Sequence, residues 1–216
     1  MLTVLLTGFE PFNGAAENPS RRAVLAVADG PSLPGCRVVA EVLPVSYAET
    51  GAALAAALAC HRPDVLIATG LAGGRAEISV ERVAINVDDA PTADNDGARR
   101  TDAPVIPGGP AAYFSTLPIK AVLGAIRAAG VPAQVSQTAG TFLCNHVFYR
   151  ACHLAATELP GLRVGFLHVP WLPEQVATQA SAPSMALASI VAALRATIAA
   201  TRETHVDLAV PAGAVD

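Results

Sequence analysis

The chain has 216 residues, of which 52% are hydrophobic and only 15% are charged, and its formal net charge is −4. A chain of this length can bury one substantial core, and its apolar runs are of strand length, far short of the ~20 residues that a membrane-spanning helix needs. The net charge is small and the Lys and Arg residues form no basic cluster. The composition therefore argues against nucleic acid and membranes as partners.

Strand-like and helix-like segments alternate along the chain. Residues 2–7 are expected to form a first strand and not a signal peptide, because no basic leader or cleavage site accompanies them. Asn18 and Pro19 then suit the cap and the first position of a helix that runs to about Ala28. The later strands are expected at residues 37–43, 65–68, 78–86 (an extended strand or a hairpin), 133–136 and 163–167. The later helices are expected at residues 47–60, 117–129, 145–158 and 184–202.

Two regions lack a regular pattern. Residues 88–110 hold many Asp, Gly and Pro residues and are predicted to form a long loop. The end of the chain, from about residue 203 to 216, is expected to be a disordered tail. The alternation of strands and helices elsewhere predicts right-handed crossovers and a single catalytic domain over residues 1–216, an α/β/α sandwich with a mainly parallel twisted sheet.

In such sheets, binding sites form in the crevice at the carboxyl ends of the strands. That rule selects residues 8–14, 70–74, 137–145 and His168 as the segments where chemistry is expected.

The four cysteines form no CxxC pair, which favours reduced thiols in a cytoplasmic protein. Of these, Cys144 is the candidate nucleophile, because it lies between a predicted strand and a predicted helix. The free N–H groups and positive dipole end of the helix should lower the pKa of its thiol and bind a developing oxyanion. Buried packing is the alternative for this residue. The other three cysteines lie in a loop, at a helix end and two turns into a helix: Cys36, Cys60 and Cys152.

His168 follows an apolar strand and is the candidate general base, because it is expected to face the crevice. Its alternative is a hydrogen-bonded core histidine. His146 is the rival base, but two residues after Cys144 at a helix start it is expected to point to a different side.

Glu81 lies within a largely apolar extended run and is the candidate for the acid that orients the histidine. Its alternative is an ion pair with Arg75 or Arg82. Asp88 and Asp89 are the other candidates for this acid, although both are expected to be solvated in a loop.

Two other patterns carry less information. Residues 70–74 are glycine-rich after a strand, yet they match neither GxGxxG nor a GK[ST] motif, so a nucleotide-binding enzyme is only the third alternative. Cys144, His146 and His168 lack a metal-ligand spacing, so no metal site is predicted.

Four stretches of the sequence carry a resemblance to a known family. They are 7–12 with 18–20, 73–86, 136–146 with Tyr149, and 166–170 with 173–175. At these residues the chain resembles the pyroglutamyl-peptidase I family, the pyrrolidone-carboxylate peptidases, over almost its whole length. The resemblance implies Glu81, Cys144 and His168 as the catalytic triad, the same residues that the physical argument selects. It also implies a homotetramer, no cofactor and a cytoplasmic location.

The function expected from this resemblance is that of a cysteine-type omega peptidase that removes N-terminal pyroglutamate (5-oxoproline) from peptides through a thioacyl-enzyme intermediate. A flat, uncharged lactam suits aromatic walls and backbone polar groups. Phe9, Phe12 and Phe142 lie at predicted strand ends or beside Cys144, so they are the expected substrate-binding residues, with core filling as their alternative.

The sequence departs from the family's pattern at two places. The family often has Gln where this chain has Leu71, and a basic residue followed by Ile where this chain has Pro91 and Thr92. Both departures are expected near the site, where they would alter the fit of the lactam ring or of the next residue. They keep two alternatives open: a thiol hydrolase of another cyclic or acylated amide, and a non-catalytic module that binds a small ligand on the same fold.

Overall fold

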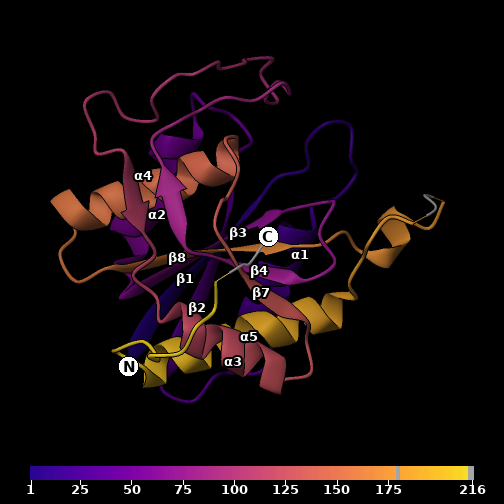
Figure 1. The fold of residues 1–216 in the computed structure, drawn as a ribbon, viewed down its shortest axis with the longest axis vertical. Helices are drawn as coiled ribbons and strands as arrows, with labels where there is room; N and C mark the ends of the chain where they lie inside the picture. The colour runs from indigo at the N-terminus through magenta and orange to yellow at the C-terminus, as the bar shows by residue number, and fades with distance from the viewer. Residues whose placement is uncertain (179–180, 214–216) are drawn as a thin grey trace.

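A six-stranded sheet runs through the middle of the molecule, in the order β2-β1-β3-β8-β4-β7 (Figure 1). The structure, a computed structural model, describes residues 1–178 and 181–213. Every pairing in this sheet is parallel except that of β4 with β8, which confirms the mainly parallel sheet. Its strands are β1 (Leu2–Phe9), β2 (Cys36–Leu43), β3 (Val65–Leu71), β4 (Ile78–Glu81), β7 (Ala133–Ser136) and β8 (Arg163–Val169).

Helices cover both faces of the sheet, as the sandwich prediction requires (Figure 1). One face carries α1 (Pro19–Ala28), α3 (Ile119–Ala128) and α5 (Leu187–Glu203). The other face carries α2 (Thr50–His61) and α4 (Leu143–Thr157). A short 3₁₀ helix, η1 (Pro173–Gln175), follows β8. Within the described residues, the helices are too short or too polar to cross a membrane.

Alternate residues of the central strands supply two separate cores. Leu6 and Ile67 face α1, α3 and α5, whereas Leu5 and Leu66 face α2 and α4. Successive side chains of a strand point to opposite faces, so a strand covered on both faces must be apolar at every position. This requirement explains the continuous apolar runs of β1 and β3.

The segment predicted as one strand or a hairpin is divided between two sheets. β4 ends at Glu81 and belongs to the main sheet, whereas β5 (Val83–Ile85) pairs with β6 (Ala112–Phe114) in a separate two-stranded sheet. The hairpin reading is therefore wrong, because the chain changes partners at Arg82. The short strand β6 was not predicted from its three residues.

Two element boundaries change the expected positions of site residues. α4 begins at Leu143, so Cys144 lies in its first turn and not before it. β8 runs to Val169, so His168 lies within the strand and not after it.

The direction of β4 corrects the rule used to locate the site. β4 runs antiparallel to β8, and β7 follows the direction of β4. The carboxyl ends of β1, β3 and β8 therefore share one edge of the sheet, but those of β4 and β7 do not. Residues 137–142 have to run back from the end of β7 towards that edge.

The segment predicted as a tail is described as far as residue 213. There the carboxylate of Asp207 accepts hydrogen bonds from the N–H groups of Lys120 and Ala121, at 3.1 Å. These donors belong to the first turn of α3, whose N-cap, Pro118, has no side-chain cap of its own. Residues 214–216, which the disorder prediction also covers, lie outside the described residues.

Candidate active site

A buried carboxylate and an imidazole face each other across β4 and β8. Nδ1 of His168 lies 2.8 Å from Oε1 of Glu81, and the Glu81 side chain is fully buried. The pairing of β4 with β8 places Glu81 opposite Phe166, two positions from His168 on the same face of the sheet. An ionised carboxylate only accepts hydrogen bonds, so this contact suits the tautomer of a neutral ring that donates from Nδ1 and has Nε2 free to accept.

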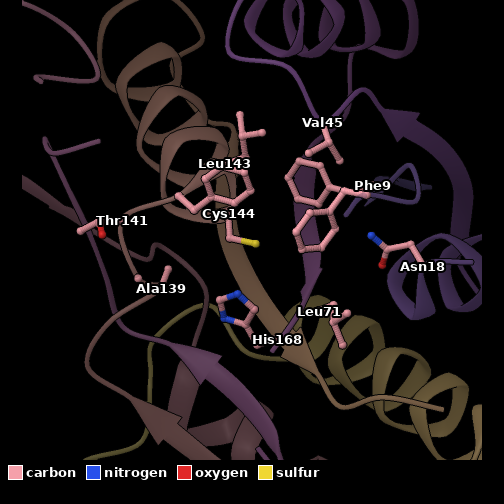
Figure 2. Close-up of a pocket in the computed structure, with 12 residues that line it drawn as sticks. Phe9, Asn18, Val45, Leu71, Ala139, Thr141, Leu143, Cys144 and His168 are labelled. Atoms are coloured by element: carbon pink, nitrogen blue, oxygen red, sulfur yellow. The ribbon is translucent and has the colours of Figure 1, made fainter. Parts of the chain in front are cut away.

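The thiol of Cys144 lies over the same face, next to β3 and β8. A Cβ atom built on Gly70 would come within 2.5 Å of Sγ of Cys144, and Gly70 is the register partner of His168. Figure 2 shows the Cys144 sulfur and the His168 ring at the same end of one pocket, which both residues line. The structure thus brings together the three residues selected from the sequence, whose separation along the chain reaches 87 positions.

The pKa of the Cys144 thiol is raised, whereas the sequence argument predicted that it is lowered. Burial, followed by the negative charge of Glu81, raises the pKa of Cys144 to about 12. Arg75 and a hydrogen bond from the backbone N–H of Cys144 itself lower this pKa, but by less. The predicted favourable effect of the helix start is therefore present and is outweighed, even though the residue keeps some exposure to the pocket. At neutral pH the resting residue is a protonated thiol, which could act as a nucleophile only with the help of a base.

The pocket in front of Cys144 is small and mainly apolar, with a volume of about 170 Å³. Phe9 (Figure 2), Phe12 and Phe142 line it. The ring centroids of Phe12 and Phe142 lie 6.0 Å apart. Cys144 and His168 are the titratable side chains among its lining residues. The pocket is therefore suited to a small, flat and uncharged group.

Of the two departures from the family pattern, one lies in the pocket. Leu71, at the end of β3, lines it (Figure 2). Pro91 and Thr92 are not among the described residues that line it. The apolar Leu71 side chain thus contributes to the wall itself.

Sequence reasoning missed several lining residues. Asn18 was assigned only as a helix cap, which it is, since its Oδ1 accepts from the Ser20 N–H. Val45 follows the carboxyl end of β2, so the strand-end rule could have found it if applied to that strand. Ala139 and Thr141 were not named individually, although they lie in the segment 137–145 that the same rule selected.

The rival base His146 belongs to a different cluster. Its Nδ1 lies 2.8 Å from Oδ2 of Asp88, which also accepts from Arg100 at 2.7 Å. Asp88 is completely buried, so the expectation that it is solvated is wrong. Tyr47 packs edge-on against His146, and its ring lies under the Arg100 guanidinium. This cluster confirms that His146 points away from Cys144.

Glu81 also forms the ion pair that was its alternative role. Nη1 of Arg75 lies 2.7 Å from Oε1 of Glu81, whereas the Arg82 side chain reaches the carbonyl of Ala212. Glu81 therefore contacts a histidine and an arginine at once.

The other three cysteines lie outside the pocket lining. Burial raises the pKa of Cys152 to about 12, so this thiol is protonated in the core, while Cys60 is exposed and Cys36 half-buried. Over residues 1–178 and 181–213, no group of three His, Cys, Asp or Glu side chains is arranged to hold a metal ion.

Comparisons with known proteins identify the family of the chain. The pyroglutamyl peptidase family model matches residues 2–204. The pyrrolidone-carboxylate peptidase of Escherichia fergusonii is 51% identical over 214 residues, 99% of each chain. The protein of the same name from Streptomyces coelicolor is 52% identical over 216 residues, again 99% of each chain.

Solved structures show the same similarity in three dimensions. Pyroglutamyl peptidase I from Bacillus amyloliquefaciens matches with a TM-score of 0.94 at 41% identity, covering 97% of this chain and 99% of that one. A mutant pyrrolidone carboxyl peptidase from Pyrococcus furiosus matches with a TM-score of 0.90 at 39% identity, covering 94% of this chain and 99% of that one. By sequence and fold, this chain belongs to the pyroglutamyl peptidase family.

Proposed function

We propose that this chain is a cysteine-type omega peptidase that hydrolyses the amide bond after an N-terminal pyroglutamate residue. The observation that carries the proposal is the buried Glu81–His168 pair, at 2.8 Å, beside a thiol in a small aromatic pocket. Relatives named pyrrolidone-carboxylate peptidase support the same activity, and they favour pyroglutamate over other cyclic or acylated amides.

The pocket chemistry supports this substrate. An enzyme that binds a free N-terminal ammonium group needs an anionic partner, but none of the described residues lining this pocket is Asp or Glu. Pyroglutamate has a neutral lactam instead of the ammonium group. We assign Phe9, Phe12 and Phe142 as the walls around that ring.

Acylation begins with the resting thiol. His168 Nε2 takes the proton of Cys144 Sγ as the sulfur attacks the pyroglutamyl carbonyl carbon and forms the S–C bond. N–H groups in the first turn of α4 are available for the oxyanion, since they have no acceptor within the helix. The C–N bond then breaks, and His168 donates its proton to the leaving amine.

Deacylation uses the same residues in reverse. His168 takes a proton from a water molecule that attacks the thioacyl carbonyl, and the C–S bond breaks. The sulfur recovers its proton and free pyroglutamate leaves. Glu81 keeps Nδ1 protonated and Nε2 directed at the reacting atoms throughout.

We also propose that the protein acts in the cytoplasm as a homotetramer, following the family resemblance. The four unpaired cysteines favour a reducing compartment, and the exposed Phe114 side chain on β6 offers an apolar contact to another subunit. Sedimentation of the purified protein should give four times the 22.0 kDa chain mass, and a monomer would contradict the assembly.

The activity test is hydrolysis of a pyroglutamyl fluorogenic amide by the reduced protein. Prolyl and acetyl amides serve as controls for ring chemistry and for simple acylation. We expect release from the pyroglutamyl amide alone, and its loss by at least about 1,000-fold in Cys144→Ala with an unchanged circular dichroism spectrum. Near-normal turnover by Cys144→Ala would exclude this residue as nucleophile, and release from neither substrate class would favour a binding module.

A further inference from the structure

Arg75 contacts Glu81 of the proposed catalytic pair and is not among the described residues that line the pocket. Its Nη1 is 2.7 Å from Oε1 of Glu81, the same oxygen that lies 2.8 Å from Nδ1 of His168. Nη1 also lies 3.3 Å from Ser136 Oγ, and Nη2 donates to the Thr138 carbonyl at 3.1 Å. One guanidinium group therefore joins the loop after β3, the acid on β4 and the segment that leads to Cys144.

The surroundings of Glu81 make this contact electrostatically important. The carboxylate is fully buried, and its second oxygen, Oε2, has no hydrogen-bond partner among the described residues. A buried carboxylate without a positive partner is strongly disfavoured, so it becomes protonated or draws a proton to a neighbouring base. Over residues 1–178 and 181–213, Arg75 and His168 are the groups within ion-pair distance of Glu81.

The other charged or titratable groups facing this cluster are few. The thiol of Cys144 approaches from α4, while Ser136, a neutral hydroxyl, approaches from the end of β7. The Arg82 side chain, next to Glu81 in the chain, is directed instead to the Ala212 carbonyl at 3.5 Å. Arg75 is thus the permanent cation that can balance Glu81 while His168 is neutral.

We propose that Arg75 is a positioning residue for the peptidase reaction, holding Glu81 ionised and oriented so that His168 rests as a neutral base. This role of Arg75 in catalysis rests on the proposed peptidase function. Without the guanidinium group, His168 is the neighbouring base that can balance the Glu81 charge by holding a proton, unless the carboxylate itself is protonated and ceases to orient the ring as an anion. His168 would then hold its proton to higher pH and could not accept the proton of Cys144.

A second effect acts on the nucleophile. Glu81 raises the pKa of Cys144 and Arg75 lowers it, so loss of the arginine would leave the acid's effect on the thiol uncompensated. Both effects reduce proton transfer from sulfur to imidazole, and neither depends on contact between Arg75 and the substrate.

The kinetic test compares Arg75→Gln with wild type, using Arg82→Gln as a matched control that removes the neighbouring arginine. We expect kcat to fall about tenfold to a hundredfold, with KM little changed because Arg75 does not line the pocket. The acidic limb of the kcat/KM profile should move to higher pH by about one unit, while Arg82→Gln leaves it in place. Arg75→Lys, which retains the charge, should keep the limb near its wild-type position.

A purely structural role gives a different result. It would lower stability and turnover in Arg75→Gln without moving the acidic limb, and that outcome would overturn the inference. An equal shift in Arg82→Gln would overturn it too. If Arg75→Gln does not fold, Arg75→Met is the second neutral variant, since it keeps an aliphatic stem and needs no hydrogen-bond partner.

A measurement without turnover separates this inference from the peptidase proposal. The NMR titration midpoint of the His168 ring should move to higher pH when Arg75→Gln is added to Cys144→Ala. His168→Gln identifies its signal among those of the five histidines. If the midpoint moves but the wild-type protein cleaves no pyroglutamyl amide, the peptidase function is refuted and the Arg75 inference is retained. If the midpoint does not move but the wild-type protein is an active peptidase, the Arg75 inference is refuted and the peptidase function is retained.

Discussion

Cys144, the proposed nucleophile, combines a helix-start position with a raised pKa, and this combination decides how its thiol would be activated. The helix start offers N–H groups and a positive dipole end, yet burial and the nearby Glu81 charge dominate. A preformed thiolate–imidazolium pair is therefore disfavoured in the empty site. Proton transfer to His168 should accompany attack on the substrate.

The ultraviolet absorbance of the thiolate tests this point. The difference between wild type and Cys144→Ala should show no thiolate at neutral pH, and the signal should rise only in the alkaline range towards about 12. Because the folded pKa is above the ordinary value of 9.0, the native state favours the protonated thiol. The stability from this preference is present below pH 9.0 and is lost as the pH rises towards the folded pKa. A thiolate signal that is complete below neutral pH would show a preformed ion pair.

Gly70 is required by the close approach of the Cys144 thiol to the sheet. An added Cβ would lie 2.5 Å from Cys144 Sγ and 2.9 Å from the Phe166 ring. Gly70→Ala should therefore displace the sulfur, lower the pyroglutamyl amidase rate by at least about tenfold and cost about 1–3 kcal/mol of stability.

Gly74→Ala is the matched control, because nothing lies within 4 Å of its added Cβ. Steady-state kinetics and urea unfolding of both variants measure the effects. Wild-type kinetics in Gly70→Ala would mean that the sulfur occupies a different position in solution.

Residue identities in the site were predictable to different degrees. Cys144 and His168 could be selected because each lies close to the end of a strongly patterned element. Glu81 remained ambiguous between an orienting acid and an ion pair, and the structure shows why: one oxygen serves Arg75 and His168 together. No spacing rule reveals a contact between side chains on strands that lie 87 residues apart.

At the scale of elements, the long loop after β5 is fixed by buried polar contacts. Asp88 exchanges two backbone hydrogen bonds with Ala103, at 2.7 and 3.0 Å, while its side chain binds His146 of α4 and Arg100. The neighbouring Asp89 N–H donates to the carbonyl of Thr141, a residue that lines the pocket. The loop therefore supports one wall of the pocket through α4 and its N-terminal segment.

Asp88→Asn should weaken this support. It keeps the size of the side chain but removes the charge that binds Arg100 and His146, so we expect the free energy of unfolding to fall by about 2 kcal/mol. Asp89→Asn, on an exposed residue, is the control and should be nearly neutral. Denaturant titration of both variants measures the difference, and equal stabilities would show that the buried charge contributes little.

The sequence predicted most elements because apolar periodicity and caps are local signals. α1 begins at the expected Asn18 cap and β7 spans the predicted residues. The separation of β4 from β5 and the existence of β6 depend on tertiary pairing, which a run of three or four residues does not encode. The buried position of Asp88 was missed for the same reason, since loop composition alone suggested solvent.

At the scale of the whole molecule, the end of the chain stabilises an element far from it in sequence. The Asp207 carboxylate binds the free N–H groups at the start of α3, where Pro118 provides no side-chain cap. Asp207→Ala should lower the free energy of unfolding by about 1 kcal/mol, the usual value of an N-terminal cap. Glu203→Ala, which removes an exposed pair with Arg202, is the control. Thermal unfolding of both variants tests the cap, and identical melting temperatures would contradict it.

The layered architecture followed from the alternation of strands and helices, because each crossover needs a helix to cover the sheet. The strand order did not follow, since local patterns do not state which strand lies beside which. The reversed β4 and β7 were missed in particular, although Glu81 reaches His168 only because β4 lies antiparallel beside β8.

The central place of β8 has a consequence for how the protein is made. β8 is the last strand among the described residues, yet it lies between the strands β2-β1-β3 and the pair β4–β7. During synthesis on the ribosome, the two halves of the sheet can form earlier but cannot join until residues 163–169 have emerged. The same event delivers His168 to Glu81 and Cys144. A nascent chain thus has no assembled form of the proposed catalytic site, and hydrolytic activity should begin only when the sheet closes.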